Sequence, residues 1–290
     1  MTDTIKPRAV AARRMLTLTT AATTAVVGLS AAAESQDIGA WQSDGNYIVL
    51  AQASGEGEAA AEGEGAAAAE GEGAAMSGEG AASGDPDQAL QRDMSFMEGH
   101  MRAGLNLYEA GDLAAAKTHM GHPIEEKYGA VADPLADRGF DRLRQQIEAV
   151  AAATESGASL ADVKDAFDAA RVTMEEVRAG MSPRDQMLGL AALIRVAGDE
   201  YTVAVEGGEI SNLHEYQDSW GFLRVVQTEL EQMEASGDDA LAHVAEESLA
   251  FLKLTNAAFG DIQGKGGMTL DPSLLYGAAA RIELEALELG

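Results

Sequence analysis

Apolar residues recur at every third or fourth position over most of the chain after residue 85, which is the spacing of one face of an α-helix. The clearest stretch carries this spacing through Leu90, Met94, Met97, Met101, Leu105 and Tyr108. No stretch alternates apolar and polar residues for long enough to predict a β-strand. The pattern therefore predicts an all-α fold.

Helix starts are marked by residues that cap the amino end of a helix. Four of the six prolines directly follow such a residue, in Asp85-Pro86, Asp133-Pro134, Ser182-Pro183 and Asp271-Pro272. The Ser or Asp side chain accepts a free backbone N–H, and proline at the first helical position has none to satisfy. Ser159, with Asp162 three residues later, adds a start of the capping-box type.

Glycines mark the helix ends, so each helix can be given approximate bounds. The predicted helices cover residues 86–110, 112–121, 134–156, 160–179, 183–206, 211–236, 238–259 and 272–288. Most connections between them are short, which favours antiparallel neighbours. We therefore predict an antiparallel bundle of about seven or eight helices.

Residues 1–33 have the order of an export signal. Basic residues come first, an uncharged apolar zone runs from Met15 to Leu29, and small residues follow up to Ala33. The apolar zone is shorter than the roughly 20 residues of a comfortable membrane span, so we expect cleavage rather than a retained anchor. Cleavage after Ala53 is a second option, and Arg13-Arg14 hints at twin-arginine export. These features predict a signal peptide and a periplasmic protein.

Residues 34–85 differ in composition from the segments on either side. They contain no Lys or Arg, and Gly-Glu-Gly and polyalanine runs make up most of the stretch from Gly55 to Gly84. Such a segment cannot bury enough apolar surface to offset the entropy lost on ordering. We therefore predict a disordered acidic linker over residues 34–85 and one helical bundle domain over residues 86–290.

Charge and amino-acid usage exclude several classes of function. The chain has 48 acidic and 20 basic residues, and its formal net charge of -28 excludes an electrostatic footprint for nucleic acid. It has no cysteine, which removes disulfide scaffolds, zinc–thiolate sites, iron–sulfur clusters and thiol nucleophiles. No nucleophile elbow and no His-Glu-x-x-His motif occurs. We expect a protein that is not an enzyme and holds no organic cofactor, although iron-dependent redox activity stays open.

Three of the five histidines lie close together in the sequence, at His100, His119 and His122. The first two predicted helices form a hairpin across Gly111, which can return His100 to the neighbourhood of His119. Glu125 adds a carboxylate to this group. Imidazole and carboxylate are ligands that suit iron, so we take these four side chains as candidate metal ligands.

Other interpretations of the same residues stay open. Met97 or Met101, together with Met120 and a histidine, would suit Cu(I), but these methionines also lie where methionine fills a core. The proline after His122 disfavours helical geometry at that residue. His122 could therefore cap a helix, with Glu125 as the third residue of a capping box.

Two later pairs have the spacing of a shared helical face. His243 and Glu246 are three residues apart, and His214 and Asp218 are four apart. Metal sites in helical bundles are assembled from such carboxylate–imidazole pairs on facing helices. For both histidines we favour surface or interface packing, and we keep His243 and Glu246 as candidate ligands.

The segment from Gly198 to Phe222 carries a resemblance to a known family. Tyr201, an Ala-Val pair, a Gly and Ile210 precede the pair Glu215-Tyr216 and then Phe222. This order resembles a stretch in the periplasmic helical domains that accompany oxidase-dependent bacterial iron permeases. The Arg-Glu-Gly-Leu-Glu motifs of the permease itself are absent.

The His-x-x-Glu pairs are also similar to the metal motif of imelysin-like iron-uptake proteins. Both resemblances imply an exported metal-handling accessory protein, with His122, Glu125, His243 and Glu246 carried over as candidate ligands. The large residues from Tyr201 to Phe222 equally serve as core residues of a chain that is poor in aromatics.

We therefore predict a periplasmic transition-metal-binding protein, with iron favoured over copper, that assists membrane metal transport or metal protection. The expected partner is a membrane iron permease or another periplasmic protein, not nucleic acid, and no stable membrane insertion follows signal cleavage. The alternative is a tetratricopeptide-like interaction scaffold without metal, because residues 107–116 resemble one such hairpin. Only one copy is visible, whereas an array normally needs three or more.

Overall fold

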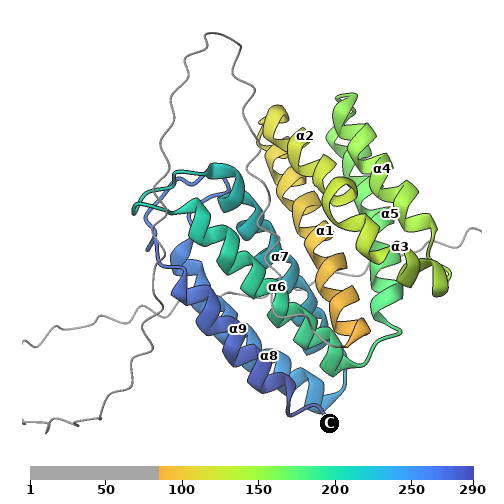
Figure 1. Ribbon diagram of the computed structural model, residues 1–290, viewed down its shortest axis with the longest axis vertical. Helices are drawn as coiled ribbons and strands as arrows, with labels where there is room; N and C mark the ends of the chain where they lie inside the picture. The colour runs from red at the N-terminus through yellow and green to blue at the C-terminus, as the bar shows by residue number, and fades with distance from the viewer. Residues whose placement is uncertain (1–84) are drawn as a thin grey trace, which may run out of the picture. The chain divides into compact units, whose positions relative to one another are not determined.

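The computed structural model describes residues 85–290, which form a bundle of α-helices (Figure 1). The helices are α1 (Pro86–Glu109), α2 (Leu113–His122), α3 (Tyr128–Asp137), α4 (Arg142–Glu155), α5 (Leu160–Arg178), α6 (Pro183–Ala204), α7 (Leu213–Glu234), α8 (Asp239–Leu254) and α9 (Ser273–Ala286). A π-helical turn, η1 (Pro123–Lys127), joins α2 to α3, and a 3-10 turn, η2 (Thr255–Ala258), follows α8. Residues 85–290 contain no β-strand, so the all-α prediction is confirmed for this part of the chain.

Three predictions fall on other residues. The signal peptide over residues 1–33, its two cleavage points and the linker up to residue 84 lie outside the described residues. Within residues 85–290, no helix has both the length and the apolar composition that crossing a membrane requires.

Most helices begin where the capping residues predict. Asp85 accepts the N–H of the second residue of α1 at 2.8 Å. Ser159 and Ser182 accept N–H groups in the first turns of α5 and α6 at 3.2 and 3.1 Å. Asp271 accepts the first N–H of α9 at 2.9 Å. These bonds satisfy backbone donors that the helix itself leaves free.

The predicted helix over residues 134–156 is wrong in its first part. Pro134 lies inside α3 and does not start a helix, and the break comes later, where Gly139 has a φ of 79° between α3 and α4. Proline inside a helix costs one hydrogen bond. The turn that precedes it buries Tyr128 and Val131, and this apolar burial outweighs the lost bond.

The buried apolar side chains form two clusters. One joins α1 to α2–α5 and includes the methionines of the predicted stripe, Met94, Met97 and Met101. The other joins α6–α9 to Phe96 of α1 and includes Tyr201. Figure 1 shows α1 between these two groups of helices. Because α1 has apolar residues on opposite faces, it connects both clusters into one domain.

Helices α1 and α7 approach each other closely at two glycines. A Cβ on Gly221 would lie 2.4 Å from the carbonyl oxygen of Gly99, and a Cβ on Gly99 would lie 2.3 Å from the Phe222 ring. A clash with backbone cannot be relieved by turning a side chain, so glycine is required for this approach. Gly99 directly precedes His100, and Gly221 follows Asp218 by nearly one turn. The crossing therefore sets the distance between His100 and Asp218.

Candidate metal centre

Four of the five histidines meet between α1, α2 and α7. They are His100 on α1, His119 and His122 on α2, and His214 on α7. The rings of His119 and His214 stack with centroids 4.3 Å apart, and the ring of His122 lies 4.8 Å from that of His214. The ring of His100 lies 5.2 Å from that of His122. The bundle thus gathers imidazoles that lie up to 114 residues apart in the sequence, from His100 to His214.

Asp218 on α7 lies at the centre of this group and is 3% exposed. Its Oδ1 lies 2.6 Å from Nδ1 of His100 and 2.8 Å from Nδ1 of His119. Its Oδ2 lies 3.3 Å from Nε2 of His214, one turn earlier on the same helix. Both oxygens of one buried carboxylate therefore face histidine nitrogens.

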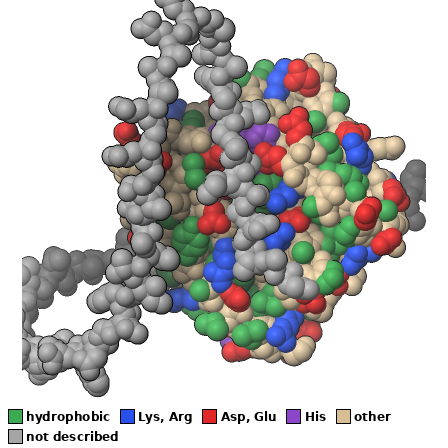
Figure 2. All heavy atoms as spheres, viewed as in Figure 1, with side chains coloured by type: hydrophobic (Ala, Val, Ile, Leu, Met, Phe, Trp, Pro, Cys, Tyr) green, Lys and Arg blue, Asp and Glu red, His purple; other side chains and the backbone are tan. Residues whose placement is uncertain are grey.

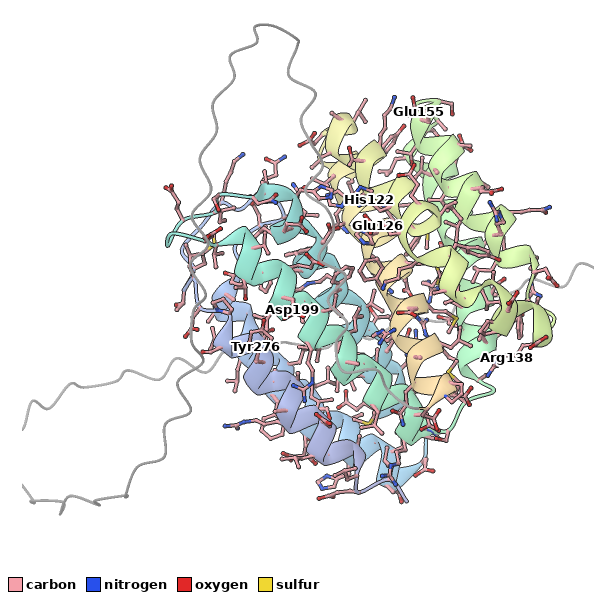
Figure 3. The ribbon with its side chains drawn as sticks, in the orientation of Figure 1. His122, Glu126, Arg138, Glu155, Asp199 and Tyr276 are labelled. Carbon is pink, nitrogen blue, oxygen red and sulfur yellow. The ribbon has the colours of Figure 1, made fainter. Side chains whose placement is uncertain are left out.

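Glu126 provides a second carboxylate from the π-helical turn η1 (Figure 3). Its Oε1 lies 3.4 Å from Nδ1 of His122, and its Oε2 lies 3.6 Å from Nε2 of His100. Figure 3 shows His122 and Glu126 side by side where α2 passes into this turn. Glu126 therefore adds a carboxylate from η1 to the group built on α1, α2 and α7.

Of the two interpretations of His122 that the sequence left open, the helix cap is wrong. Its φ of -53° and ψ of -41° are helical, and its side chain makes no capping hydrogen bond. The chain accommodates Pro123 by widening into a π turn, in which the N–H of Tyr128 bonds to the carbonyl of Pro123. Such single π turns are frequent at functional sites. Here the turn keeps the chain helical across the proline and places Glu126 beside His122.

A pair of carboxylates lies beside the histidines. Glu200 on α6 is hydrogen-bonded to Glu215 on α7. Burial raises the pKa of Glu200 to about 9, with further contributions from Glu215 and from the charges of Asp218 and Glu126. At neutral pH the Glu200 carboxyl therefore holds a proton, because another negative charge at this place would be repelled.

Burial and the charge of Asp218 together set the protonation states of the side chains in the group. Burial acts to raise the pKa of the Asp218 carboxyl, but the charges of His100 and His119 prevail and hold it well below its usual range. Burial acts to lower the pKa of His119, but Asp218 prevails and raises it. Burial lowers the pKa of His214 to about 4 and also lowers that of His122. Asp218 is therefore ionised at neutral pH, and His122 and His214 are neutral, with a lone pair free for a ligand.

His100 is the least satisfied side chain of the group. It is 2% exposed, yet neither of its ring nitrogens makes a well-directed hydrogen bond to any of the described residues. Its Nδ1 lies 2.6 Å from Asp218 without the alignment of a hydrogen bond. Buried polar atoms nearly always have a well-directed partner, so His100 and Asp218 offer a nitrogen and an oxygen to a ligand bound between them. A metal ion bound between the two would satisfy both, and imidazole nitrogen with carboxylate oxygen suits iron and other first-row metals.

The predicted ligands divide into two sets. The structure brings His100, His119 and His122 together within groups of donor atoms that lie within 4.8 Å of one another. Glu125, His243 and Glu246 are exposed and belong to no such group among residues 85–290.

The sequence interpretation missed three members of the group. They are His214, Asp218 and Glu126. The spacing of His214 and Asp218 was a usable signal, since residues four apart share a helical face. Nothing in the sequence distinguished Glu126 from Glu125.

The fold and the site together define a helical bundle with a buried histidine–carboxylate centre. The model of one protein family, the iron permease-associated 4-helix bundle domain, matches residues 179–265. This match contains the segment from Gly198 to Phe222 and confirms the resemblance there. It includes His214 and Asp218, whereas the donors from α1, α2 and η1 precede it. No curated protein and no solved structure matches the chain.

Proposed function

We propose that this protein is an exported accessory of a membrane iron permease and that its histidine–carboxylate centre binds a transition metal as cargo. One observation carries the proposal: the buried His100 makes no well-directed hydrogen bond to the described residues, and its Nδ1 lies 2.6 Å from the ionised Asp218. The family match over residues 179–265 supports an accessory role in iron transport. Export rests on the signal-like order of residues 1–33.

The chemistry of the donors favours iron over Cu(I). The centre offers imidazole nitrogen and carboxylate oxygen, which bind iron well. Cu(I) prefers sulfur ligands, and the chain has no cysteine. Met97, Met101 and Met120 pack in the apolar cluster of α1–α5 and are at most 1% exposed. Their packing agrees with the role of methionine as a core filler.

The exposed side of the centre gives the metal a route to the buried donors. The side chains of His122, His214 and Glu126 are 16, 32 and 35% exposed, whereas His100 and Asp218 are almost fully buried. Figure 2 shows histidine and acidic side chains together at the surface of the face in view. The carboxylates attract a cation to this opening.

Binding requires protons to leave the centre. The pKa of His119 is raised by Asp218, so its Nδ1 carries a proton that an incoming ion must displace. Its Nε2 lies 2.9 Å from Oε1 of Gln217, which accepts the other ring hydrogen. Gln217 therefore fixes the ring so that Nδ1 faces Asp218 and the metal. We propose a binding role, in which these residues hold and release an ion without a catalytic step.

The test is elemental analysis of the protein purified from the exported fraction without chelator, followed by anaerobic Fe(II) titration. We expect stoichiometric Fe(II) binding, and its loss in the double variant His119→Ala, His122→Ala with the helical circular dichroism retained. The matched control is His243→Ala on α8, which lies outside the centre and should bind Fe(II) as the unmodified protein does.

Two results would overturn the proposal. Full Fe(II) binding by the double variant would exclude this centre as the site. Absence of metal from the purified protein, together with failure to bind Fe(II) at micromolar concentration, would exclude a metal-handling role. A pull-down that captures the same partner with and without chelator would then favour the interaction scaffold.

A further inference from the structure

The donor atoms of the centre form three triads. In each triad the donor atoms all lie within 4.8 Å of one another. The inner triad is His100, His119 and Asp218, the outer triad is His122, His214 and Asp218, and the third is His100, His122 and Glu126. A single ion with bonds of about 2.1 Å holds all its ligand atoms within about 4.2 Å of one another. The donor atoms fall into three overlapping triads and do not form one set compact enough for a single ion. This arrangement indicates more than one position for an ion.

Only one combination of triads can be filled at the same time. A neutral imidazole has one lone pair, so each histidine binds one ion. The third triad shares His100 with the inner triad and His122 with the outer triad, and therefore competes with both. The inner and outer triads share only Asp218, which has two oxygens. These two triads can therefore hold one ion each.

The geometry of Asp218 agrees with this division. Its Oδ1 faces the histidines of the inner triad, at 2.6 Å from His100 and 2.8 Å from His119. Its Oδ2 faces His214 of the outer triad at 3.3 Å. A carboxylate that bridges two ions about 3.5–4 Å apart presents one oxygen to each of them.

Glu126 also reaches both triads. Its Oε1 lies 3.4 Å from His122 of the outer triad, so it can serve as a further ligand of the outer ion. Its Oε2 lies 3.6 Å from Nε2 of His100, the nitrogen that carries the hydrogen when Nδ1 binds the inner ion. Glu126 would then orient His100 through Oε2 and bind the outer ion through Oε1.

We propose that the centre binds two divalent first-row metal ions, which share Asp218 as a bridging ligand. This inference rests on the proposed function and adds the number of ions bound and the order in which they exchange with solvent. The inner triad is buried throughout, whereas His122 and His214 are partly exposed. The outer ion therefore exchanges with solvent, and the inner ion is held behind it.

The experiment is an anaerobic Fe(II) titration of the purified full-length protein, with bound iron counted by elemental analysis after removal of free metal. We expect about two equivalents of Fe(II) per chain. The double variant His122→Ala, His214→Ala removes both histidines of the outer triad and should keep about one equivalent, held by the inner triad. His243→Ala is the control and should bind about two.

A second measurement distinguishes a bridged pair from two separate sites. With Mn(II) in place of iron, electron paramagnetic resonance should show a spin-coupled pair in the unmodified protein and an isolated ion in the outer-triad variant. Circular dichroism of each variant shows whether it is folded.

Each other outcome decides between the two proposals. One equivalent in the unmodified protein would overturn the two-ion centre and leave the proposed function standing. No binding would overturn both. Two uncoupled ions, or two equivalents in the outer-triad variant, would place the second ion elsewhere and overturn the bridged centre.

Discussion

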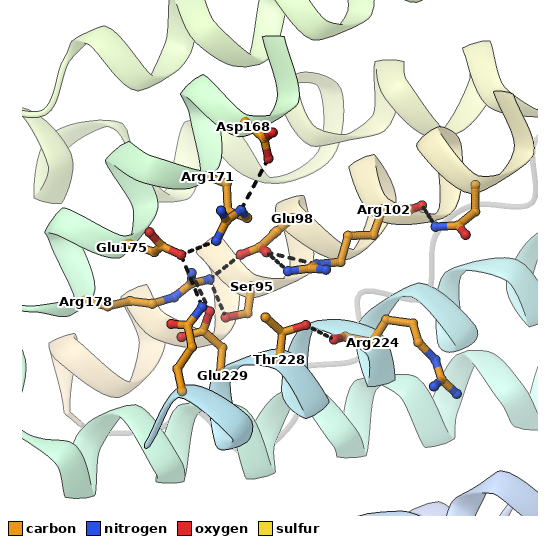
Figure 4. A network of polar contacts seen from close by, with 12 residues as sticks. Ser95, Glu98, Arg102, Asp168, Arg171, Glu175, Arg178, Arg224, Thr228 and Glu229 are labelled. Carbon is orange, nitrogen blue, oxygen red and sulfur yellow. Dashed lines mark hydrogen bonds and ion pairs between the residues drawn. The ribbon is translucent and has the colours of Figure 1, made fainter. Parts of the chain in front are cut away.

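Two buried clusters of ionisable side chains lie along α1 and α7, and they differ in the groups that face their buried carboxylates. In the first, the arginine cluster, Arg178 of α5 lies between Glu98 of α1 and Glu229 of α7 (Figure 4). Arg178 is 2.7 Å from Glu98 and 2.9 Å from Glu229. The second is the histidine–carboxylate centre around Asp218, where imidazoles face the buried carboxylate.

The arginine cluster pairs buried carboxylates with permanent cations. Burial acts to raise the pKa of Glu98, but Arg178 and Arg102 prevail and lower it. Arginine keeps its charge at every accessible pH, so these contacts are permanent. In the histidine–carboxylate centre, by contrast, the groups that face Asp218 are imidazoles, which can release a proton and bind a metal ion instead. The difference indicates that the first cluster joins helices and that the second is arranged for an exchangeable cation.

Helical geometry explains how both clusters share the same two helices. Glu98 and His100 are two residues apart, so they point to different sides of α1. Asp218 and Glu229 are close to three full turns apart and share a face of α7. One helix pair thus carries a structural ion-pair network and a ligand site side by side.

The largest effect should come from Arg178→Met. This change leaves two carboxylates buried without their main partner, which should lower the free energy of unfolding by about 3–5 kcal/mol. Urea denaturation measures it. The control is Arg142→Met, which breaks an exposed ion pair with Glu176 and should change stability by about 0.5 kcal/mol or less. If Arg178→Met unfolded at the same urea concentration as the unmodified protein, the arginine cluster would not have the structural role assigned to it.

A somewhat smaller effect is expected from Gly221→Ala, which changes the crossing that both clusters share. The added Cβ would lie 2.4 Å from the backbone of Gly99, so α1 and α7 must move apart. We expect a loss of about 2 kcal/mol in stability, as for other overpacked positions, and weaker Fe(II) binding because His100 separates from Asp218. Thermal unfolding and Fe(II) titration measure the two effects.

Gly277→Ala is the matched control for this change. Gly277 lies inside α9 with nothing within 4 Å of its added Cβ. Alanine there should stabilise the protein by about 0.5–1 kcal/mol through helix propensity and leave Fe(II) binding unchanged. If Gly221→Ala kept full Fe(II) affinity, the close crossing would not be what positions the centre.

A third effect, no larger than the second, concerns the pH dependence of the metal-free protein. The folded state holds a proton on Glu200 up to about pH 9, whereas the unfolded chain releases it near the ordinary value of 4.5. Stability from this group is therefore fully present below that value and is lost as the pH rises towards 9. Glu200→Gln should remove this loss, so that the free energy of unfolding of the variant exceeds that of the unmodified protein by about 2 kcal/mol at pH 8.

Urea denaturation at pH 5 and pH 8, with chelator present, measures the difference. Glu234→Gln, at an exposed position near the end of α7, is the control and should keep the pH dependence of the unmodified protein. If the free energy of unfolding changed equally between pH 5 and pH 8 in Glu200→Gln and in the unmodified protein, Glu200 would be ionised in the folded state. The centre would then tolerate its charge.

Local patterns were enough to predict most of the fold. The spacing of apolar residues gave the helices, and caps such as Asp85 and Ser182 gave their starts, because these signals depend on bonds within one turn. Pro134 misled the prediction because burial of residues outside its own turn decided where α3 begins. The methionine stripe of α1 was correctly placed in the core, since three- and four-residue spacing fixes a helical face.

The sequence by itself determined the helices, their caps, the acidic composition and the family resemblance between Gly198 and Phe222. Only the tertiary structure decided which donors meet, because His100 and Asp218 come together through the glycine crossing of two helices distant in sequence. It also selected Glu126 over Glu125, since one residue turns a side chain by about 100° around the helix axis. Local bonds fix elements, whereas a site built from several helices depends on how those elements pack.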